Sequence, residues 1–413
     1  MALAATAEIR THFPALQRMH GSFPVAYFDG PGGTQVPSSV PIAIADYLFH
    51  RNSNANWPFP TSAETDRIRH QARKAMADFL GGKPEEIVFG ANMTTLTYHL
   101  SRALGAEMGP GDELVVTELD HHGNVDPWKA LEDERGVRVR TLPMVPETGT
   151  LDLSHFPELL NDRTRLVALG AASNILGTVT DIPPLAQMAK AVGAKVFVDA
   201  VHLAPHRRIQ VEDMGCDFLA CSPYKFYGPH MGVLWIRSEL LETMQVPKVA
   251  PAPKTGPGRF ESGTVNSEGM AGTTAAVEFL CSLAIPDLGS REEKLDAVFS
   301  ALQEREGVLF ERLWRGLADH PRVHLYGPPP SEDRAPTLSF TVEGTPAREV
   351  SARLADESGA FLSHGDFYAA TVVDRLGLRP HGMVRAGVGI YTTEEEVDRV
   401  VEGVRRIASE GRG

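Results

Sequence analysis

The sequence predicts an α/β fold in which a large domain with a mainly parallel sheet precedes a smaller C-terminal α+β domain. Two observations predict the large domain. Short apolar runs alternate with longer helical or loop stretches between about residues 84 and 238, and each run is rich in Val, Ile, Leu or Phe over the length of a buried strand. A third observation is the length, because 413 residues exceed what one compact core usually holds and favour two.

The predicted strands of the large domain are the apolar runs at 86–90, 112–118, 164–171, 194–200, 216–222 and 231–237. Helices are predicted between them. They span residues 94–104, 126–135 and 183–192, and the last follows Asp181 and has two prolines at its start, which is typical of a helix N-terminus. The Pro/Gly-rich stretch from 246 to 264 predicts a long loop.

The C-terminal part mixes helices with a strand. A charged amphipathic helix is predicted over 291–319, a strand over 337–342, and further helices over 347–357 and 394–408. We therefore expect three parts: a helical N-terminal arm over 1–25, a large domain over 26–290 and a small domain over 291–413.

Composition limits the classes of partner. The 53 acidic residues outnumber the 40 basic ones, for a net charge of −13, which disfavours nucleic acid and anionic membranes as partners. No apolar stretch reaches the roughly 18 residues that span a bilayer, and the first residues do not resemble an export signal. The three cysteines form no CxxC pair, as is usual in a reducing compartment. These features predict a soluble cytoplasmic protein.

Polar residues follow five of the predicted strands, and in parallel sheets ligands bind beyond these carboxyl ends. They are Asn92-Met93-Thr94-Thr95, Asp120-His121-His122-Gly123-Asn124, Ser173-Asn174, Asp199 with His202, and Ser222-Pro223-Tyr224-Lys225. Pyridoxal 5'-phosphate (PLP) needs a lysine amine for a Schiff base and a carboxylate for its ring nitrogen. It also needs N–H donors at a helix start for its phosphate and a flat ring for stacking. The set therefore predicts a PLP site.

The chain resembles the class V aminotransferase family of fold-type-I PLP enzymes, and within it the cysteine desulfurase and selenocysteine lyase branch. The resemblance runs from YFDGPGGTQVP near residue 27 to VRAGVGIYTTEEEVDRV near residue 400. Its most specific segments are TELDHHGNVDPW, ASNILGTVTDI, KVFVDAVHLAPH, CSPYKFYGPHMGVLWIR and RFESGTVNS. It implies a fold-type-I PLP-dependent transferase, a small amino-acid substrate and a homodimer with shared active sites.

The resemblance also implies a role for each residue of the site. Lys225 would form the Schiff base and move the proton at Cα, Asp199 would pair with the pyridine nitrogen, and His121 would stack on the ring. The remaining cofactor contacts would come from Met93, Thr94, Asn174, His202, Ser222 and, from a second subunit, Thr264. Substrate contacts would come from Arg385, as the clamp of the carboxylate, and from Asn174, Tyr368 and His364. No metal is expected.

One segment departs from the desulfurase pattern. Desulfurases of this branch carry a cysteine nucleophile in a GHHCA-like loop, whereas this chain reads SHGDFYAATV and places Tyr368 at that position. The GDFYA form resembles a subfamily described as cysteine desulfurase-like. Because a tyrosine cannot form a persulfide, we expect β-elimination (C–S lyase activity) on cysteine or a cysteine S-conjugate. The alternative is a PLP-dependent aminotransferase, epimerase or decarboxylating or deaminating enzyme, possible in secondary metabolism, because the same residues serve these reactions.

Several less specific interpretations stay open. His121 and His122 with Asn124 and Asp126 could form a metal cluster, His121, Asp199 and His202 could serve a metal hydrolase, and the chain could be a non-catalytic binding module. Thr94 and Thr95 could be a helix cap. The turn over 29–33 fits no phosphate-loop pattern and is expected to line the substrate pocket, and the loop with His364, Asp366 and Tyr368 could be aromatic packing.

Overall fold

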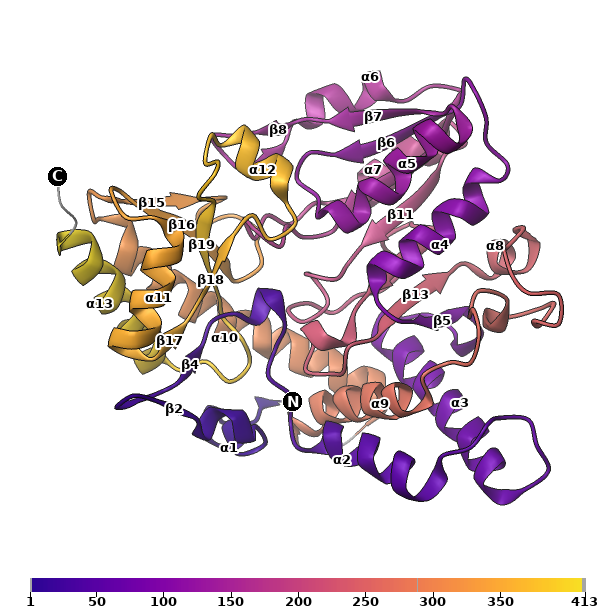
Figure 1. The fold of residues 1–413 in the computed structure, drawn as a ribbon, viewed down its shortest axis with the longest axis horizontal. Coiled ribbons are helices and arrows are strands. Elements are labelled where there is room, and N and C mark those ends of the chain that lie inside the picture. The colour runs from indigo at the N-terminus through magenta and orange to yellow at the C-terminus, as the bar shows by residue number, and fades with distance from the viewer. Residues whose placement is uncertain (1, 288, 411–413) are drawn as a thin grey trace.

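The computed structural model describes residues 2–287 and 289–410, and within them the chain forms a seven-stranded sheet and a separate four-stranded sheet (Figure 1). The strands of the larger sheet, in sheet order, are β5 (Ile87–Gly90), β13 (Gly232–Ile236), β12 (Phe218–Cys221), β11 (Lys195–Asp199), β10 (Thr164–Gly170), β6 (Glu113–Thr117) and β7 (Arg138–Leu142). All six predicted strands are present, so the α/β prediction is confirmed.

Most neighbours in this sheet are parallel. The pairs β12–β11, β11–β10, β10–β6 and β6–β7 run parallel, and only β13 is antiparallel to its neighbours. Parallel neighbours need crossover connections, which bring their carboxyl ends to one edge. One strand of this sheet, β7, was not predicted from the sequence. It lies at the sheet edge and carries Arg138 and Arg140. Charged side chains are common on edge strands, where they discourage pairing with other chains.

Helices cover both faces of the larger sheet. One face packs against α4 (Met93–Gly105) and α5 (Asp126–Arg135), and the other against α3 (Pro60–Leu80), α7 (Ile182–Ala191), α9 (Ser267–Ser282) and the first half of α10 (Arg291–Ala318). Each face has its own hydrophobic core, the first under α4 and α5 and the second under α3, α7, α9 and α10. Successive strand residues alternate between them: Leu114 and Val116 point into the first core, and Val115 points into the second.

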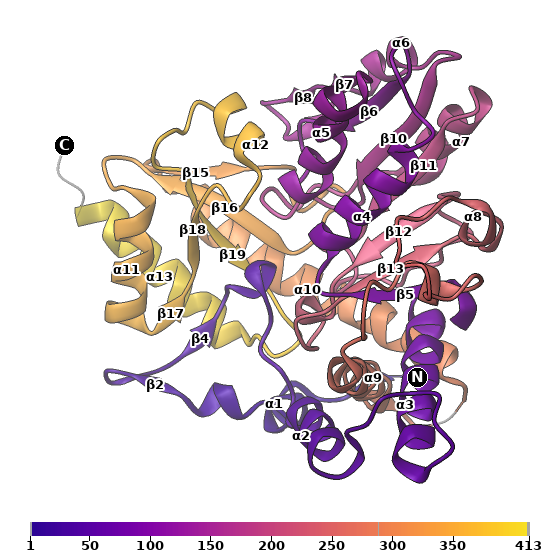
Figure 2. The same ribbon diagram turned by 45° about the vertical axis from the view of Figure 1, so that its right-hand side comes forward.

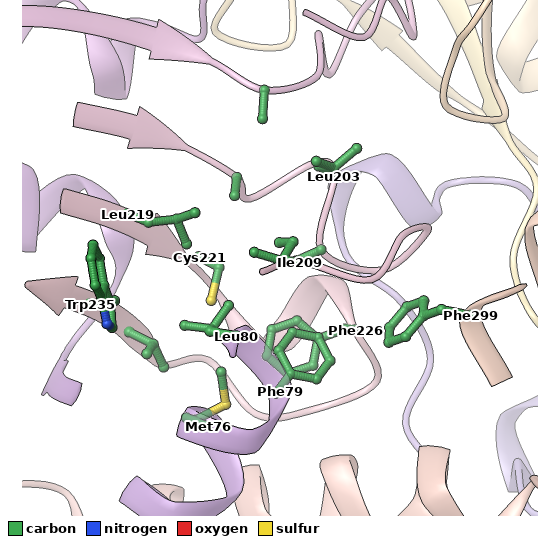
Figure 3. Close-up of a cluster of buried hydrophobic side chains, with 14 of the residues drawn as sticks. Met76, Phe79, Leu80, Leu203, Ile209, Leu219, Cys221, Phe226, Trp235 and Phe299 are labelled. Atoms are coloured by element: carbon green, nitrogen blue, oxygen red, sulfur yellow. The ribbon is translucent and has the colours of Figure 1, made fainter. Parts of the chain in front are cut away.

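Figure 3 shows part of the second core, where Met76, Phe79 and Leu80 of α3 face strand residues such as Leu219 and Trp235. Phe79 stacks on Phe226, with ring centroids 4.5 Å apart and planes at 24°, a geometry that aromatic pairs favour. Since Phe226 directly follows Lys225, this packing anchors the turn that carries the lysine.

The four-stranded sheet has the order β15 (Val323–Tyr326), β16 (Thr337–Val342), β19 (Met383–Gly387) and β18 (Ser363–Gly365). One face is covered by α11 (Ala347–Ser358), α13 (Glu394–Glu410) and the second half of α10. Val384 and Ala386 point into that core, so Arg385 between them projects from the opposite face. That face meets the loop after β10 of the larger sheet, since Ser339 Oγ donates a hydrogen bond to the carbonyl of Ile175 at 2.5 Å.

The arm predicted to be helical has one short α-helix, α1 (Thr6–Thr11), and a 3-10 helix over Pro14–Gln17, and is otherwise built of turns and two-residue strands. β1 (Ala2–Leu3) pairs with β14 (Ala284–Ile285), β2 (Met19–His20) pairs with β3 (Phe23–Pro24), and β4 (Ala26–Tyr27) pairs with β17 (Ala360–Phe361). β1 ties the arm to the strand after α9, and β4, directly after the arm, lies beside β17 of the C-terminal part (Figure 2). A run of residues stabilised by distant partners carries little local helical signal. The predicted limits at residues 26 and 291 stay predictions.

The remaining α-helices and strands are α2 (Ser39–Asp46), β8 (Met144–Val145), β9 (Thr150–Leu151), α6 (Phe156–Leu159), α8 (Ser238–Thr243) and α12 (Ala370–Arg375). A search of the described helices finds none that combines the length and the apolar character needed to cross a membrane.

Candidate active site

A cavity lies at the carboxyl ends of the parallel strands, and it brings together most of the site residues that the sequence predicted. Its lining residues are Asn92, Met93, Thr94, Asp120, His121, Gly170, Ala172, Asn174, Asp199, Val201, His202, Ser222, Tyr224 and Lys225. Eight of the nine predicted cofactor residues are therefore neighbours, and Thr264 is the exception.

Lys225 ends a short helical turn that follows β12, and its side chain is buried. The ammonium group donates a hydrogen bond to the carbonyl of Pro31. Burial, together with the positive charge of Arg385, lowers the pKa of Lys225 to about 7, although Asp199 acts in the opposite direction. An amine that is partly unprotonated at neutral pH is a competent nucleophile and base.

Asp199 is the last residue of β11, and its Oδ1 accepts a hydrogen bond from the backbone N–H of Val201 at 2.9 Å. Burial raises the pKa of this carboxyl to about 6, and the charge of Lys225 partly offsets the effect. A buried carboxylate of raised pKa needs a cation or a strong donor to be ionised. A protonated ring nitrogen would supply one.

A second buried carboxyl group, Asp120, has no role in the sequence prediction. Its Oδ1 accepts from the backbone N–H of Gly170 at 2.8 Å, and its Oδ2 accepts from Asn124 Nδ2 at 3.0 Å. Burial and the nearby Asp199 raise its pKa well above the ordinary value. Asp120 thus joins the ends of β6 and β10, and its position directly after a predicted strand is the signal that marked it.

His121 presents a neutral imidazole to the cavity. Its Nδ1 accepts a hydrogen bond from the backbone N–H of Gly123 at 2.8 Å, so the ring proton belongs on Nε2. Burial and the charge of Lys225 lower its pKa to about 4. The Tyr368 ring lies 5.4 Å away, tilted by 32°. A neutral flat ring in this position suits stacking on a planar cofactor.

Two buried polar atoms of the cavity have no hydrogen-bond partner among the described residues, Asn174 Oδ1 and His202 Nδ1. The other ends of both side chains are fixed. Asn174 Nδ2 donates to the carbonyl of Phe367 at 2.9 Å, and His202 Nε2 lies 2.9 Å from Thr337 Oγ1. Buried polar atoms are normally satisfied, so each of these calls for a ligand atom.

The N-terminus of α4 is suited to bind a phosphate group. Asn92 caps this helix, because its Oδ1 accepts from the backbone N–H of Thr95 at 2.8 Å. The cap is therefore Asn92 rather than Thr94 or Thr95. Free N–H groups at a helix N-terminus are of the kind that bind anions, and Met93 and Thr94 of this first turn line the cavity together with Ser222. The amine, carboxylate, flat ring, unpaired polar atoms and helix start together fit PLP.

Arg385 reaches the site from the smaller sheet. Its Nη1 donates to the carbonyl of Asn174 at 2.9 Å, its Nε donates to Ser363 Oγ at 3.3 Å, and its guanidinium carbon lies 3.9 Å from the centroid of the Phe367 ring. Burial lowers its pKa to about 9. No carboxylate of the described residues forms an ion pair with it, so a substrate carboxylate has a buried cation to bind.

The loop after β18 touches this arginine and the cavity mouth. Phe367 and Tyr368 both have left-handed backbone conformations, with φ of 55° and 59°, which are unusual for bulky residues and cluster at functional sites. The carbonyl of Tyr368 accepts from the backbone N–H of His122 at 2.7 Å, while its side chain is 73% exposed. The contact with His121 places Tyr368 at the mouth of the cavity.

Two predicted site residues lie elsewhere in the single chain. His364 is exposed and pairs with Val384 in the sheet register, so it projects from the face opposite Arg385, and Ser363 is the residue of β18 that contacts the arginine. Thr264 lines a different cavity together with Asn54, Asn56 and Trp57. Their predicted roles stay predictions.

The metal interpretation finds no matching cluster. His122 contacts Asp126 at 3.1 Å and Thr371 Oγ1 at 3.2 Å. Within residues 2–287 and 289–410, no three His, Cys, Asp or Glu side chains are arranged to hold an ion.

Comparisons with known proteins agree with this geometry. The family model described as "Aminotransferase class-V" matches residues 26–400. A cysteine desulfurase of Serratia proteamaculans is 32% identical over 415 residues, which cover 97% of each chain, and one of Pectobacterium carotovorum is 33% identical with the same coverage. The apo cysteine desulfurase of Thermococcus onnurineus superposes with a TM-score of 0.88 at 28% identity, covering 99% of this chain and 100% of that one. The cysteine desulfurase CsdA of Escherichia coli gives 0.84 at 26% identity, covering 98% of each.

Proposed function

The chain belongs to the aminotransferase class-V family, and from this premise we propose that it cleaves the C–S bond of cysteine or a cysteine S-conjugate without a protein-bound persulfide. It is a PLP-dependent enzyme of the cysteine desulfurase-like kind. One observation carries the finer proposal: the loop over the cavity mouth bears Tyr368, and no cysteine lines the cavity.

All three cysteines of the chain are buried, and none of them lines the cavity. Cys221 precedes Ser222, but its sulfur points into the apolar cluster with Met76 and Leu80 (Figure 3). Burial raises the pKa of Cys216 and Cys281 to about 12, and that of Cys221 higher still. A thiol of such pKa supplies almost no thiolate at neutral pH, so none of the three is suited to receive sulfur.

The proposed reaction needs no sulfur acceptor. The substrate loses its Cα proton, the Cβ–S bond breaks, and the sulfur leaves with the electron pair and takes up a proton as a thiol. Water then hydrolyses the released enamine to pyruvate and ammonium. PLP supplies an electron-withdrawing ring that stabilises negative charge at Cα.

The residues of the cavity divide this work. Arg385 binds the substrate carboxylate and so orients Cα. Lys225 Nζ accepts the Cα proton, for which a pKa near 7 is well matched. Asp199 would hold the ring nitrogen of PLP as a cation, and His121, which is neutral at pH 7, would stack on the ring without adding charge.

The pH dependence of cofactor uptake tests the state of Lys225. Only the unprotonated amine attacks the aldehyde of PLP, and its folded pKa of about 7 lies below the usual 10.5. We therefore expect the rate of reconstitution, followed by the visible absorbance of cofactor-free protein mixed with PLP, to rise up to about pH 7 and then level off. A rate that keeps rising about tenfold per pH unit beyond pH 9 would show an ordinary lysine.

A variant without cysteines tests the absence of a sulfur acceptor. The triple variant Cys216→Ala, Cys221→Ala and Cys281→Ala should keep thiol release from substrate within about threefold of wild type. Its thermal midpoint should fall, because each small buried truncation costs about 1 kcal/mol of unfolding free energy. A folded triple variant that loses about 100-fold or more in sulfur release would contradict the proposal.

We also propose a homodimer whose partner completes the site. Large apolar side chains are exposed on and after α2 at Ile42, Leu48, Phe49, Trp57 and Phe59, a concentration typical of an interface. Thr264 shares its cavity with Trp57, so an interface here would bring Thr264 to the partner.

Negative charges introduced into this apolar surface test the homodimer. Phe49→Asp combined with Trp57→Asp should give a monomer in light scattering and weaken PLP retention, because burying an unpaired charge in an interface is costly. Val308→Asp, at an equally exposed apolar residue of α10, is the control and should leave the mass unchanged. A dimer that persists in the double variant would place the interface elsewhere.

Product analysis tests the proposed function as a whole. Wild-type enzyme incubated with S-methyl-L-cysteine should release methanethiol and pyruvate in equal amounts without an added keto acid. Amino-group exchange that depends on a keto acid would favour the aminotransferase alternative, and racemised substrate would favour the epimerase.

A further inference from the structure

A second cavity adjoins the cavity that holds Lys225. Its volume is about 660 Å³, within the range of small-molecule sites. Tyr224 lines both cavities and forms the wall between them. The apolar side chains of the second cavity are Val36, Val40, Pro41, Ile44 and Pro229.

The second cavity borders the reactive amine. Lys225 Nζ donates to the carbonyl of Pro31, and the next residues, Gly32 and Gly33, line the second cavity. The loop is held against the lysine turn, since the backbone N–H of Thr34 donates to the carbonyl of Tyr224 at 3.0 Å. A substrate whose Cα lies at Lys225 therefore has this cavity as a neighbour.

The same cavity borders the carboxylate clamp. Ser363, which accepts from Arg385 Nε at 3.3 Å, is one of its lining residues. Gly32 is another, and a Cβ on it would lie only 3.4 Å from Arg385 Nη2. An amino acid held between Arg385 and Lys225 thus has the cavity beside both of its fixed ends.

The charge of the residues that line the second cavity favours uncharged substituents over anionic ones. No lysine or arginine lines the second cavity, while Asp29 does. Burial raises the pKa of Asp29, and its Oδ1 has no partner among the described residues. An anionic substituent would meet this carboxyl group, and the nearby cation, Arg385, would already be bound to the substrate carboxylate. His230 stacks on Tyr224, with centroids 5.0 Å apart and planes at 10°, which gives the cavity a flat wall.

We propose that this cavity binds the group attached to sulfur, and that the substrates are cysteine S-conjugates with uncharged, apolar substituents. The inference rests on the proposed C–S lyase function and names its substrate class. Free cysteine would leave the apolar wall of Val36, Val40 and Ile44 without a contact, and an S-alkyl chain would cover it.

A substrate series tests the proposal without any variant. For S-methyl-, S-ethyl-, S-propyl- and S-butyl-L-cysteine, kcat/KM for pyruvate release should rise about fourfold per methylene, the effect of burying one such group. S-carboxymethyl-L-cysteine, of a size similar to the propyl compound but anionic, should be a poorer substrate than S-propyl-L-cysteine by about tenfold or more. Dissociation constants from the change in the visible spectrum should fall along the same series.

A variant that fills the second cavity provides a second test of the proposal. Val36→Trp should lower the ratio of kcat/KM for the butyl and methyl substrates by about tenfold or more, because the indole occupies the space for the chain. The matched control, Val249→Trp, changes an exposed valine that lines none of the described cavities and should leave the ratio as in wild type.

Failure of this inference is distinguishable from failure of the proposed function. Pyruvate released at equal rates from all conjugates, or fastest from free cysteine or the carboxymethyl compound, would overturn the pocket assignment and keep the lyase. No pyruvate from any substrate would overturn the lyase. In that case the spectral dissociation constants still decide the pocket: tighter binding along the alkyl series supports it, and equal binding rejects it.

Discussion

Lys225→Ala is expected to abolish catalysis, with kcat lower by at least about 10⁴-fold, or about 5 kcal/mol of transition-state stabilisation. In the proposed roles, Lys225 is both the amine that attaches the cofactor and the base at Cα, and the variant loses both. The other cavity residues stay in place, so the folded protein should still take up PLP noncovalently. After borohydride treatment, peptide mass spectrometry should find the reduced cofactor on Lys225 in wild type and on no residue in the variant.

Lys195→Ala is the matched control. Lys195 is the first residue of β11, at the end of the strand opposite Asp199, so its loss should leave kcat within about twofold. Borohydride reduction that attaches the cofactor to another lysine of the wild-type protein would contradict the assignment of Lys225.

Asp199→Asn is expected to lower kcat by about 10²- to 10³-fold, or about 3–4 kcal/mol. The amide keeps the hydrogen bond to the backbone of Val201 and the shape of the side chain, but it removes the negative charge that, in the proposed role, would hold the ring nitrogen as a cation. The absorbance spectrum of the loaded variant should show a changed pH dependence, which a purely structural residue would not alter.

Asp120→Asn separates charge from position. Asp120 is also buried at a strand end, but its two oxygens accept from Gly170 and Asn124, and its pKa is raised well above the ordinary value. A raised pKa favours the neutral form of this carboxyl group, so conversion to an amide should lower kcat by less than Asp199→Asn does. Equal losses in the two variants would show that Asp199 acts through the fold rather than through its charge.

The sequence predicts the larger sheet well because its central strands are buried on both faces and form continuous apolar runs. The edge strand β7 escapes prediction because Arg138 and Arg140 break that pattern. The helix α3 was not predicted either, because its buried positions include Ala72 and Ala75, which give little hydrophobic signal.

The cavity is predictable to the extent that it depends on strand ends. Parallel topology alone brings Asp199 and Lys225 to one edge, without knowledge of any side-chain contact. Asp120 differs, because its role depends on the N–H of Gly170 in another strand. The choice between Ser363 and His364 depends on the register of β18, where a shift of one residue exchanges the two faces, and the sequence does not reveal that register.

The central claim is that sulfur leaves as a free thiol and never resides on the protein. The most direct test is anaerobic incubation with L-cysteine, followed by quantification of pyruvate and alanine and by intact-protein mass spectrometry. We predict pyruvate and sulfide in equal amounts and an unchanged protein mass, because elimination breaks the Cβ–S bond toward sulfur. Alanine as the main product, together with a protein heavier by one sulfur atom, would contradict the account.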